Sequence, residues 1–170
     1  MTMRTRHRIW RYGDHVNTDV IFPGKYTYSV QHDAGALARH ALEDLDPAFA
    51  ASVRPGDVIV AGRNWGNGSS REQAVTCLSA CGLRAVIADS FARIYYRNAI
   101  NNGLPALVCP GAAALASTGA ELTLDLEAGE VELAGQTLRL EPLPQSLRRI
   151  LAAGGLIEAL KAEAQAGAGV

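Results

Sequence analysis

Residues 57–81 read DVIVAGRNWGNGSSREQAVTCLSAC, and this stretch decides the fold. It opens with a short apolar run, Asp57–Ala61, that is typical of a buried strand. A glycine-rich segment, Gly62–Gly68, comes next, and Arg71–Cys81 then places apolar side chains at helical spacing before Gly82. This order of strand, glycine loop and helix predicts one unit of an α/β domain.

The same alternation continues toward the C-terminus. Strands separated by helices of this length favour a parallel, buried sheet with right-handed crossovers. Beyond Pro110 the pattern changes to short alternating segments joined by tight turns, which favours antiparallel strands. The expected elements are a strand at Arg84–Ala88, a helix at Phe91–Ile100, a strand at Leu104–Cys109, and antiparallel strands at Glu121–Leu126, Glu130–Leu133 and Thr137–Leu140.

The N-terminal part is expected to supply a strand, a loop and a helix. A first strand is predicted at Arg8–Tyr12, preceded by a frayed end or, alternatively, by a basic arm. Polar turn residues after Gly13 predict a loop that contains a brief strand at Val20–Phe22. Apolar periodicity predicts a helix at Ala34–Leu42.

The C-terminal part predicts two closing helices, separated by Gly154 and Gly155, with apolar faces. The Ala- and Gly-rich end, residues 163–170, holds nothing that forms a core, so we expect a domain at 1–162 and a flexible tail at 163–170. The fold class is therefore a single α/β domain. Its central, mostly parallel sheet is expected to carry helices on one side and a smaller β layer, Glu121–Leu140, on the other.

Composition excludes several classes of protein. The chain has 170 residues, with 16 Lys and Arg against 17 Asp and Glu, so its formal net charge is −1. Nothing in bulk attracts it to a polyanion, which disfavours nucleic-acid binding. With 48% hydrophobic and 19% charged residues it is a soluble globular protein rather than a disordered or fibrous one. No apolar stretch is long enough for a signal or a membrane span.

The cysteines and histidines predict no metal site in this chain. Cys77, Cys81 and Cys109 are an odd number without a secretory segment, so we expect free thiols in the cytoplasm. Cys77 and Cys81 share the apolar face of one helix, and no third ligand is spaced to join them, which favours core packing. The four histidines form no ligand set, and only His15 lies close enough to the glycine loop to remain of interest.

The segment Asn64–Glu72 is the most informative for chemistry. Gly66 and Gly68 allow a tight turn and a close approach to a ligand, and the helix N-terminus behind them offers N–H groups to an anion. Arg71 adds a planar guanidinium that can hold one carboxylate through two parallel hydrogen bonds. These features predict a carboxylate-binding site.

A structural interpretation of the same residues is a capping box, in which Ser69 caps the helix and Glu72 reaches back to its amide. The two interpretations are compatible, because Ser70 and Arg71 would still face a ligand. The loop lacks the lysine and the spacing of a P-loop, and it lacks the third glycine of a dinucleotide-binding fingerprint.

Three motifs, in order, carry a resemblance to a known family. They are GDHVNTDVI at 13–21, GRNWGNGSSREQA at 62–74 and SFARIYYRNAINNGLP at 90–105, and GGLI at 154–157 also fits. Over about residues 7–162 the chain resembles the small-subunit family of isopropylmalate isomerase and homoaconitase, the swivelling domain of the aconitase family. The resemblance implies a single swivelling β/β/α domain.

The resemblance also implies a mechanism. The family acts as a hydro-lyase that moves a hydroxyl between adjacent carbons of a small di- or tricarboxylate through an unsaturated intermediate. A [4Fe-4S] cluster in a separate large subunit activates that hydroxyl, so this chain would bind no cofactor itself and would work in a heterodimer or heterotetramer. By motif position, Ser69 corresponds to the catalytic base, and Ser70 and Arg71 to the groups that bind the substrate carboxylate.

The segment that meets the variable substituent of the substrate follows Pro23-Gly24 in such subunits. Here it reads Tyr26-Thr27-Tyr28-Ser29-Val30, without the arginine that would suit a further carboxylate, so an alkyl group such as isopropyl is favoured. Tyr28 is the expected contact. The implied reaction is the exchange of 2- and 3-isopropylmalate through isopropylmaleate in leucine biosynthesis. Homoaconitate or a methyl- or dimethylmalate-type acid is the alternative substrate.

Several roles stay open at this stage. Arg93 is a candidate substrate contact, although it could equally face the partner. Asp14 and Thr18 are expected to shape their loop through side-chain turns, and Gly66 and Gly68 to shape theirs. An RNA-binding regulatory module is the alternative from another class, which the net charge of −1 opposes.

Overall fold

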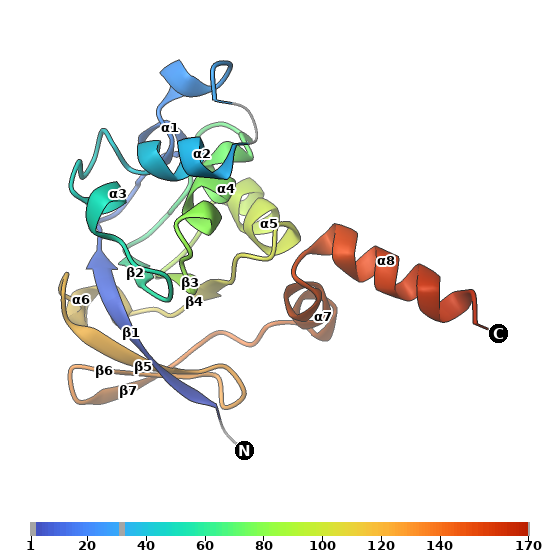
Figure 1. Ribbon diagram of the computed structural model, residues 1–170. Helices are drawn as coiled ribbons and strands as arrows, with labels where there is room; N and C mark the ends of the chain where they lie inside the picture. The colour runs from blue at the N-terminus through green and yellow to red at the C-terminus, as the bar shows by residue number, and fades with distance from the viewer. Residues whose placement is uncertain (1–2, 31–32, 170) are drawn as a thin grey trace.

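A computed structural model describes residues 3–30 and 33–169 (Figure 1). Within these residues, one sheet of seven strands has the order β4-β3-β2-β1-β5-β6-β7. The first four strands in the chain pair in parallel and form the half that the alternation of strands and helices predicted. They are β1 (Arg4–Arg11), β2 (Val58–Ala61), β3 (Ala85–Ala88) and β4 (Ala106–Val108).

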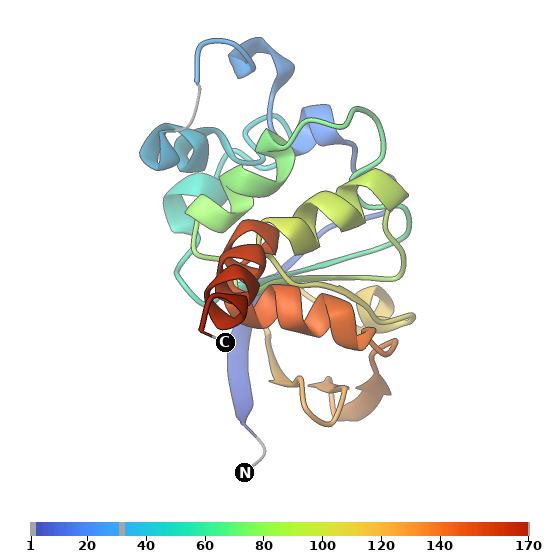
Figure 2. The same ribbon diagram turned by 90° about the vertical axis from the view of Figure 1, so that its right-hand side faces the viewer.

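Helices cover one face of the parallel strands. Side chains such as Ile59 and Val86 point into a core shared with Leu78 and Ile100 of the covering helices. Figures 1 and 2 show α4 and α5 lying across this face. The elements on this side are α1 (Thr18–Ile21), η1 (Gly24–Tyr26), α2 (Ala34–His40), α3 (Phe49–Ser52), α4 (Gln73–Ala80) and α5 (Arg93–Asn101).

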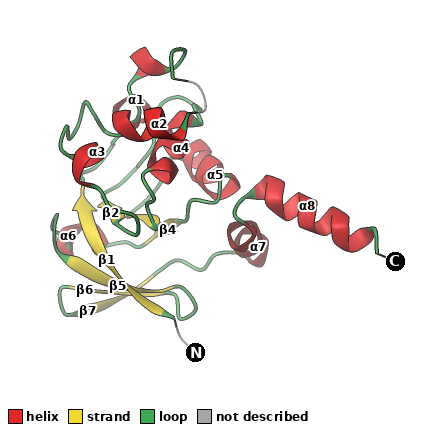
Figure 3. Ribbon diagram, in the orientation of Figure 1, coloured by secondary structure: helices red, strands yellow, loops and turns green. Residues whose placement is uncertain are grey.

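The antiparallel strands β5 (Glu121–Asp125), β6 (Glu130–Leu133) and β7 (Gln136–Arg139) belong to the same sheet. We expected a separate layer, but β5 pairs directly with β1, and the sheet curls (Figure 3). The curl places Leu124 and Val131 in a second core with Val58 and Val60, on the face opposite the helices. Helix α6 (Ala112–Leu115) contributes to this second core.

Two helices close the chain, α7 (Gln145–Ala153) and α8 (Leu156–Gly167). Figure 1 shows α8 extending away from the body of the domain. The boundary expected at Ala162 therefore falls inside α8, because an alanine-rich sequence without proline continues the helix. The flexibility of residues 163–169 stays a prediction.

Two other elements differ from the expectation. Val20–Phe22 is not a strand, because the Asn17 side chain accepts a hydrogen bond from Val20 N at 3.0 Å and starts helix α1. Strand β1 begins at Arg4 rather than Arg8, because its first five residues pair with β5. The N-terminal segment from Arg4 onward is thus neither frayed nor a free arm.

Three of the four arginines of β1 are paired with acids, and Arg11 donates to Ala113 O. Arg4 pairs with Glu132 at 3.0 Å, Arg6 with Glu121 at 3.9 Å, and Arg8 with Asp57 at 2.6 Å. A basic stripe for a polyanion would need these charges to be free. Among the described residues, no helix is long and apolar enough to cross a membrane.

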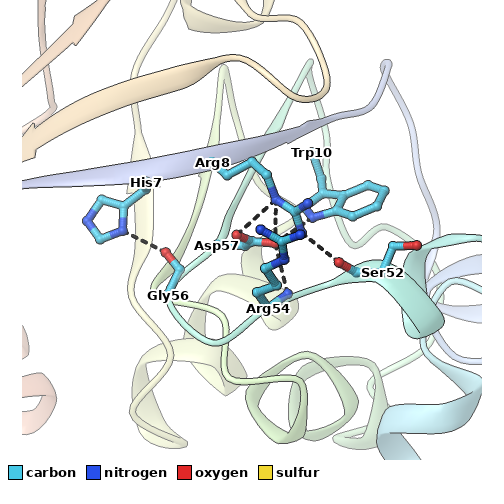
Figure 4. A network of polar contacts seen from close by, with 7 residues as sticks. All are labelled: His7, Arg8, Trp10, Ser52, Arg54, Gly56 and Asp57. Atoms are coloured by element: carbon cyan, nitrogen blue, oxygen red, sulfur yellow. Dashed lines mark hydrogen bonds and ion pairs between the residues drawn. The ribbon is translucent and has the colours of Figure 1, made fainter.

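Asp57, at the start of β2, is the centre of a buried polar network (Figure 4). Its carboxylate is 4% exposed and accepts hydrogen bonds from Arg8 Nη2 at 2.6 Å, Trp10 Nε1 at 2.9 Å and Arg54 N at 2.9 Å. Burial opposes ionisation, but these donors outweigh it and lower the pKa of Asp57 below its usual value. The network fixes β1 against β2.

We expect Asp57→Asn to destabilise the protein by about 2–4 kcal/mol, because donors buried around the carboxylate lose their charged acceptor. Urea unfolding measures the loss. Glu121→Gln is the matched control, since it removes an exposed partner of β1 and is expected to cost under about 1 kcal/mol. Equal losses in both variants would contradict the role of Asp57.

The stability that Asp57 contributes is expected to fall as the pH is lowered. Because the pKa of Asp57 is lowered by folding, its stabilisation is present above the unfolded pKa near 3.8 and is lost as the pH falls through the folded value. The Asp57→Asn variant is expected to lose less stability on acidification below pH 4 than the original chain. Urea midpoints at several pH values, with Glu121→Gln in parallel, test this.

Candidate functional site

Two loops that follow the carboxyl ends of β1 and β2 meet and form the site. Residues 13–18 run beside 62–69, where His15 N donates to Arg63 O at 2.7 Å and Thr18 N donates to Asn67 O at 2.8 Å. Gly66 N donates back to Val16 O at 2.8 Å. The loops are thus paired along their backbones, although they lie about fifty residues apart in the chain.

Asp14 joins the two loops at this junction, whereas the sequence predicted a side-chain turn within its own loop. Its Oδ1 accepts a hydrogen bond from Arg63 N at 2.7 Å. That bond, together with the Arg63 guanidinium, lowers the pKa of the Asp14 carboxyl. A side chain at Gly62 would collide with the Asp14 carboxylate, so the glycine is needed for the two loops to approach.

The glycine loop adopts positive φ at three residues. Gly66 has φ +81° and Gly68 has φ +106°, and Asn64 adopts φ 57°. A Cβ on Gly66 would lie 2.1 Å from the Tyr95 ring, which packs directly beneath the loop. Gly66 and Gly68 therefore shape the loop because glycine, which has no Cβ, allows both positive φ and a close approach of neighbouring atoms.

Ser69 lies at the meeting point of the two loops. Its Oγ is 3.0 Å from Arg71 Nε and 3.1 Å from Thr18 Oγ1. Thr18 was predicted to shape its own loop, and the structure brings its hydroxyl to Ser69 instead. The Ser69 residue is exposed.

The expected capping box is absent from this site. Helix α4 begins at Gln73, its N-cap is Glu72, and no side chain caps it. Glu72 accepts a hydrogen bond from Asn102 at 3.0 Å rather than reaching back to Ser69. The Ser69 hydroxyl is therefore committed to Thr18 and Arg71, which leaves the chemical interpretation as the one that the contacts favour.

Each of the three guanidinium nitrogens of Arg71 has a partner. Besides the bond from Nε to Ser69, Nη1 donates to Thr27 Oγ1 at 2.6 Å, and Nη2 forms an ion pair with Asp19. A carboxylate therefore already contacts this guanidinium, through one nitrogen rather than through the two parallel hydrogen bonds that were predicted for a ligand. Sequence analysis missed Asp19 and Thr27, because neither position in the chain signals a contact with Arg71.

The segment after η1 is held to α4 rather than free. Gln73 Nε2 donates to Thr27 O at 3.0 Å and to Val30 O at 2.8 Å. Tyr26 stacks on His40, and its hydroxyl donates to Glu43 at 3.1 Å, so this tyrosine serves the structure. Tyr28 is 92% exposed and stays available for a contact made outside this chain.

Ser70 and Arg93 are both exposed beside the site. The residue of α5 that reaches the Ser69 loop is Asn98, whose Nδ2 donates to Ser70 O at 3.1 Å. No ion pair or hydrogen bond of the Arg93 side chain is found among the described residues. Arg93 thus stays a prediction, and Asn98 is a contact that sequence reasoning missed.

The cysteines are buried free thiols. Burial raises the pKa of Cys81 and of Cys109 to about 11, and it also raises the pKa of Cys77 well above its usual value. In the parts of the chain that the structure describes, no three Cys, His, Asp or Glu side chains gather to hold a metal ion. Cys77 and Cys81 pack in the helix-side core, as their spacing predicted.

Comparisons with known proteins place this arrangement in a family. A model of the aconitase C-terminal domain matches residues 23–111, which include the Ser69 loop and α5. This chain belongs to the aconitase C-terminal domain family. A 3-isopropylmalate dehydratase small subunit from Halothermothrix orenii is 45% identical over 161 residues, covering 94% of this chain and 96% of that protein.

The chain is also similar to other members of the family. A methanogen homoaconitase small subunit from Methanothermobacter thermautotrophicus is 48% identical over 154 residues, covering 89% of this chain and 88% of that protein. A crystal structure of 3-isopropylmalate dehydratase from Methanocaldococcus jannaschii has a TM-score of 0.91, with 42% identity over 98% of both chains. The fold and the family are therefore shared over nearly the whole chain, among relatives named for different substrates.

The loop geometry gives a testable expectation. We expect Gly66→Ala to destabilise the protein by about 3 kcal/mol, since the substitution combines positive φ with a collision against Tyr95. Gly129→Ala is the matched control, because Gly129 has φ +69° but open space around it, and its cost is expected near 1 kcal/mol. Chemical unfolding of both variants measures the difference, and equal costs would show that the contact with Tyr95 is unimportant.

Proposed function

We propose that this chain is the small subunit of a hydro-lyase that interconverts 2-isopropylmalate and 3-isopropylmalate through isopropylmaleate, in leucine biosynthesis. The observation that carries the proposal is the Ser69 hydroxyl, held 3.0 Å from Arg71 Nε in an exposed residue. Family membership supports the reaction class, and the contacts of Ser69 and Arg71 support their assignment.

In the proposed reaction Ser69 Oγ, as the alkoxide, accepts the proton from the carbon next to a substrate carboxylate. The electron pair of that C–H bond forms the double bond as the hydroxyl leaves the adjacent carbon with its bonding electrons, to be taken up by the group that activates it. Rehydration would then add a hydroxyl to the carbon that lost the proton and a proton to the carbon that lost the hydroxyl, which gives the isomer. The charge that develops on the carboxylate is stabilised by Arg71 and by donors around Ser70. A serine is a weak base, so nearby donors must favour its alkoxide.

The Arg71–Asp19 ion pair supports a carboxylate-binding role. A guanidinium that already holds one carboxylate has the shape and the charge to hold another. In the proposed complex the substrate carboxylate shares or replaces Asp19 on Arg71. Ser70, exposed beside Arg71, provides a second hydroxyl for the same group.

The group that activates the leaving hydroxyl is proposed to be a [4Fe-4S] cluster in a large subunit. The cysteines of this chain do not fit such a cluster, because all three are buried and two of them pack in the helix-side core. This chain thus contributes the base and the carboxylate-binding side chains, in a heterodimer or heterotetramer. Free thiols accord with the reducing cytoplasm that we propose as its location.

The substrate proposal depends on the Tyr26–Val30 segment. Tyr26 is engaged with His40 and Glu43, which leaves Tyr28 as the side chain free to meet a substituent. No arginine is present in this segment to pair with a further carboxylate, and an unpaired buried carboxylate is costly. An alkyl substituent is therefore favoured over the third carboxylate of homoaconitate.

We expect Ser69→Ala to lower kcat by about 10²–10⁴-fold in the enzyme reconstituted with its large subunit under anaerobic conditions, because the base is removed. Assembly is expected to be unchanged, as measured by size-exclusion chromatography. Ser79→Ala, an exposed serine on α4, is the control and should retain full activity. An active Ser69→Ala enzyme would overturn the assignment of the base.

The substrate is tested by comparing the hydration of isopropylmaleate, homoaconitate and methylated maleates. We expect the highest kcat/KM with isopropylmaleate, with the same preference in Tyr28→Phe, which keeps the ring. Tyr28→Arg is expected to shift the preference toward homoaconitate, because it supplies a partner for the extra carboxylate. A preference of the original chain for homoaconitate would keep the mechanism and overturn the substrate.

A further inference from the structure

The Thr18 hydroxyl occupies an unusual position for a residue at the start of a short helix. Thr18 is 1% exposed, and its backbone is fixed by the hydrogen bond from its N–H to Asn67 O at 2.8 Å. Its Oγ1 lies 3.0 Å from Ser69 N and 3.1 Å from Ser69 Oγ. Both partners of this buried hydroxyl thus belong to one residue, 51 positions away in the chain.

Hydrogen-bond accounting assigns the direction of the contact between the two hydroxyls. Ser69 N–H can only donate, so Thr18 Oγ1 accepts from it. The Thr18 proton is then left for Ser69 Oγ, the other partner of this hydroxyl among the described residues. Arg71 Nε–H also donates to Ser69 Oγ, at 3.0 Å. With Thr18 as the donor, which gives its buried proton a partner, Ser69 Oγ receives two hydrogen bonds, one from Thr18 and one from Arg71.

We propose that Thr18 is a positioning residue that orients Ser69 and, by donating to its oxygen, favours the alkoxide form. The inference rests on the proposed function, in which Ser69 is the base. Two donors stabilise a developing negative charge on the oxygen that receives them, and a buried donor does so without reorganisation. The contact from Thr18 to Ser69 N also holds the residue at its backbone, so the hydroxyl cannot turn away by a movement of the loop.

The alternative is that Thr18 only closes the junction of the two loops. The two roles differ in what they need from the side chain. A donor to Ser69 Oγ requires the hydroxyl, whereas packing at the junction requires the volume of the side chain. Thr18→Val keeps the volume and removes the hydroxyl, and Thr18→Ser keeps the hydroxyl and removes the methyl group.

The test uses the complex with the large subunit, reconstituted anaerobically and assayed with isopropylmaleate and 3-isopropylmalate. We expect Thr18→Val to lower kcat by about 10- to 100-fold with KM changed by less than about twofold, which corresponds to the loss of one hydrogen bond to a charged oxygen. Thr18→Ser is expected to stay within about threefold of the original kcat. Thr137→Val, which removes an exposed hydroxyl on the edge strand β7, is the control and should change neither constant.

The pH dependence of kcat distinguishes a hydrogen-bond donor at position 18 from a side chain that only fills space. If Thr18 favours the alkoxide, kcat of Thr18→Val should continue to rise with pH where the original enzyme has levelled off. Thr18→Ala also removes the hydroxyl, and it serves as the second variant if valine disturbs folding. Unfolding midpoints and assembly with the large subunit are measured for every variant. A parallel fall of kcat and assembly in the Val, Ala and Ser variants would reduce Thr18 to a structural role and overturn the proposal.

The same experiment keeps this inference distinct from the proposed function. If Ser69→Ala stays active, the assignment of the base fails, whatever Thr18 does. If Ser69→Ala is inactive while Thr18→Val is fully active, only the role of Thr18 fails. In the Ser69→Ala background, Thr18→Val should cause no further loss of residual activity, because its effect is exerted through the Ser69 oxygen. An additional loss of tenfold or more in that background would overturn the proposal.

Discussion

The pairing of β1 with two different neighbours is the constraint on which the rest of the structure depends. On one edge β1 runs parallel to β2, and on the other it runs antiparallel to β5. It therefore joins the helix-covered half of the sheet to the half that curls into the second core. The Asp57 carboxylate holds this strand in register from the β2 side through Arg8 and Trp10. A strand in this position cannot shift without moving both cores.

The same pairing places the site. Because β1 and β2 are parallel and adjacent, their carboxyl ends lie at one edge of the sheet, where α/β proteins commonly bind ligands. The loop after β3 joins them there, since Asn64 N donates to Ser90 Oγ at 2.8 Å. Ser69, Thr18 and Arg71 meet at this edge through contacts that no single loop could make alone. The close approach of the Gly66 backbone to Tyr95 fixes the loop above α5.

Local sequence patterns predicted the elements well where the signal was periodic and deeply buried. β2, β3 and α4 were found within about two residues of their expected bounds, since continuous apolar runs and helical spacing depend little on distant residues. The expected strand at Val20–Phe22 failed because a single side chain, Asn17, caps a helical turn there. The capping box at Ser69 failed because its hydroxyl found partners in tertiary structure that outcompete the local backbone.

By itself, the sequence determined the α/β class, the glycine loop between a strand and a helix, the buried free cysteines and the candidate residues Ser69 and Arg71. These follow from side-chain periodicity, from glycine at positions of positive φ and from the chemistry of each residue type. Tertiary structure alone decided that β5 joins β1, that the Thr18 hydroxyl contacts Ser69, and that Asp19 and Thr27 occupy Arg71. The physical reason is that a hydrogen bond or an ion pair depends on distances of about 3 Å between side chains, which only the packing of distant segments sets.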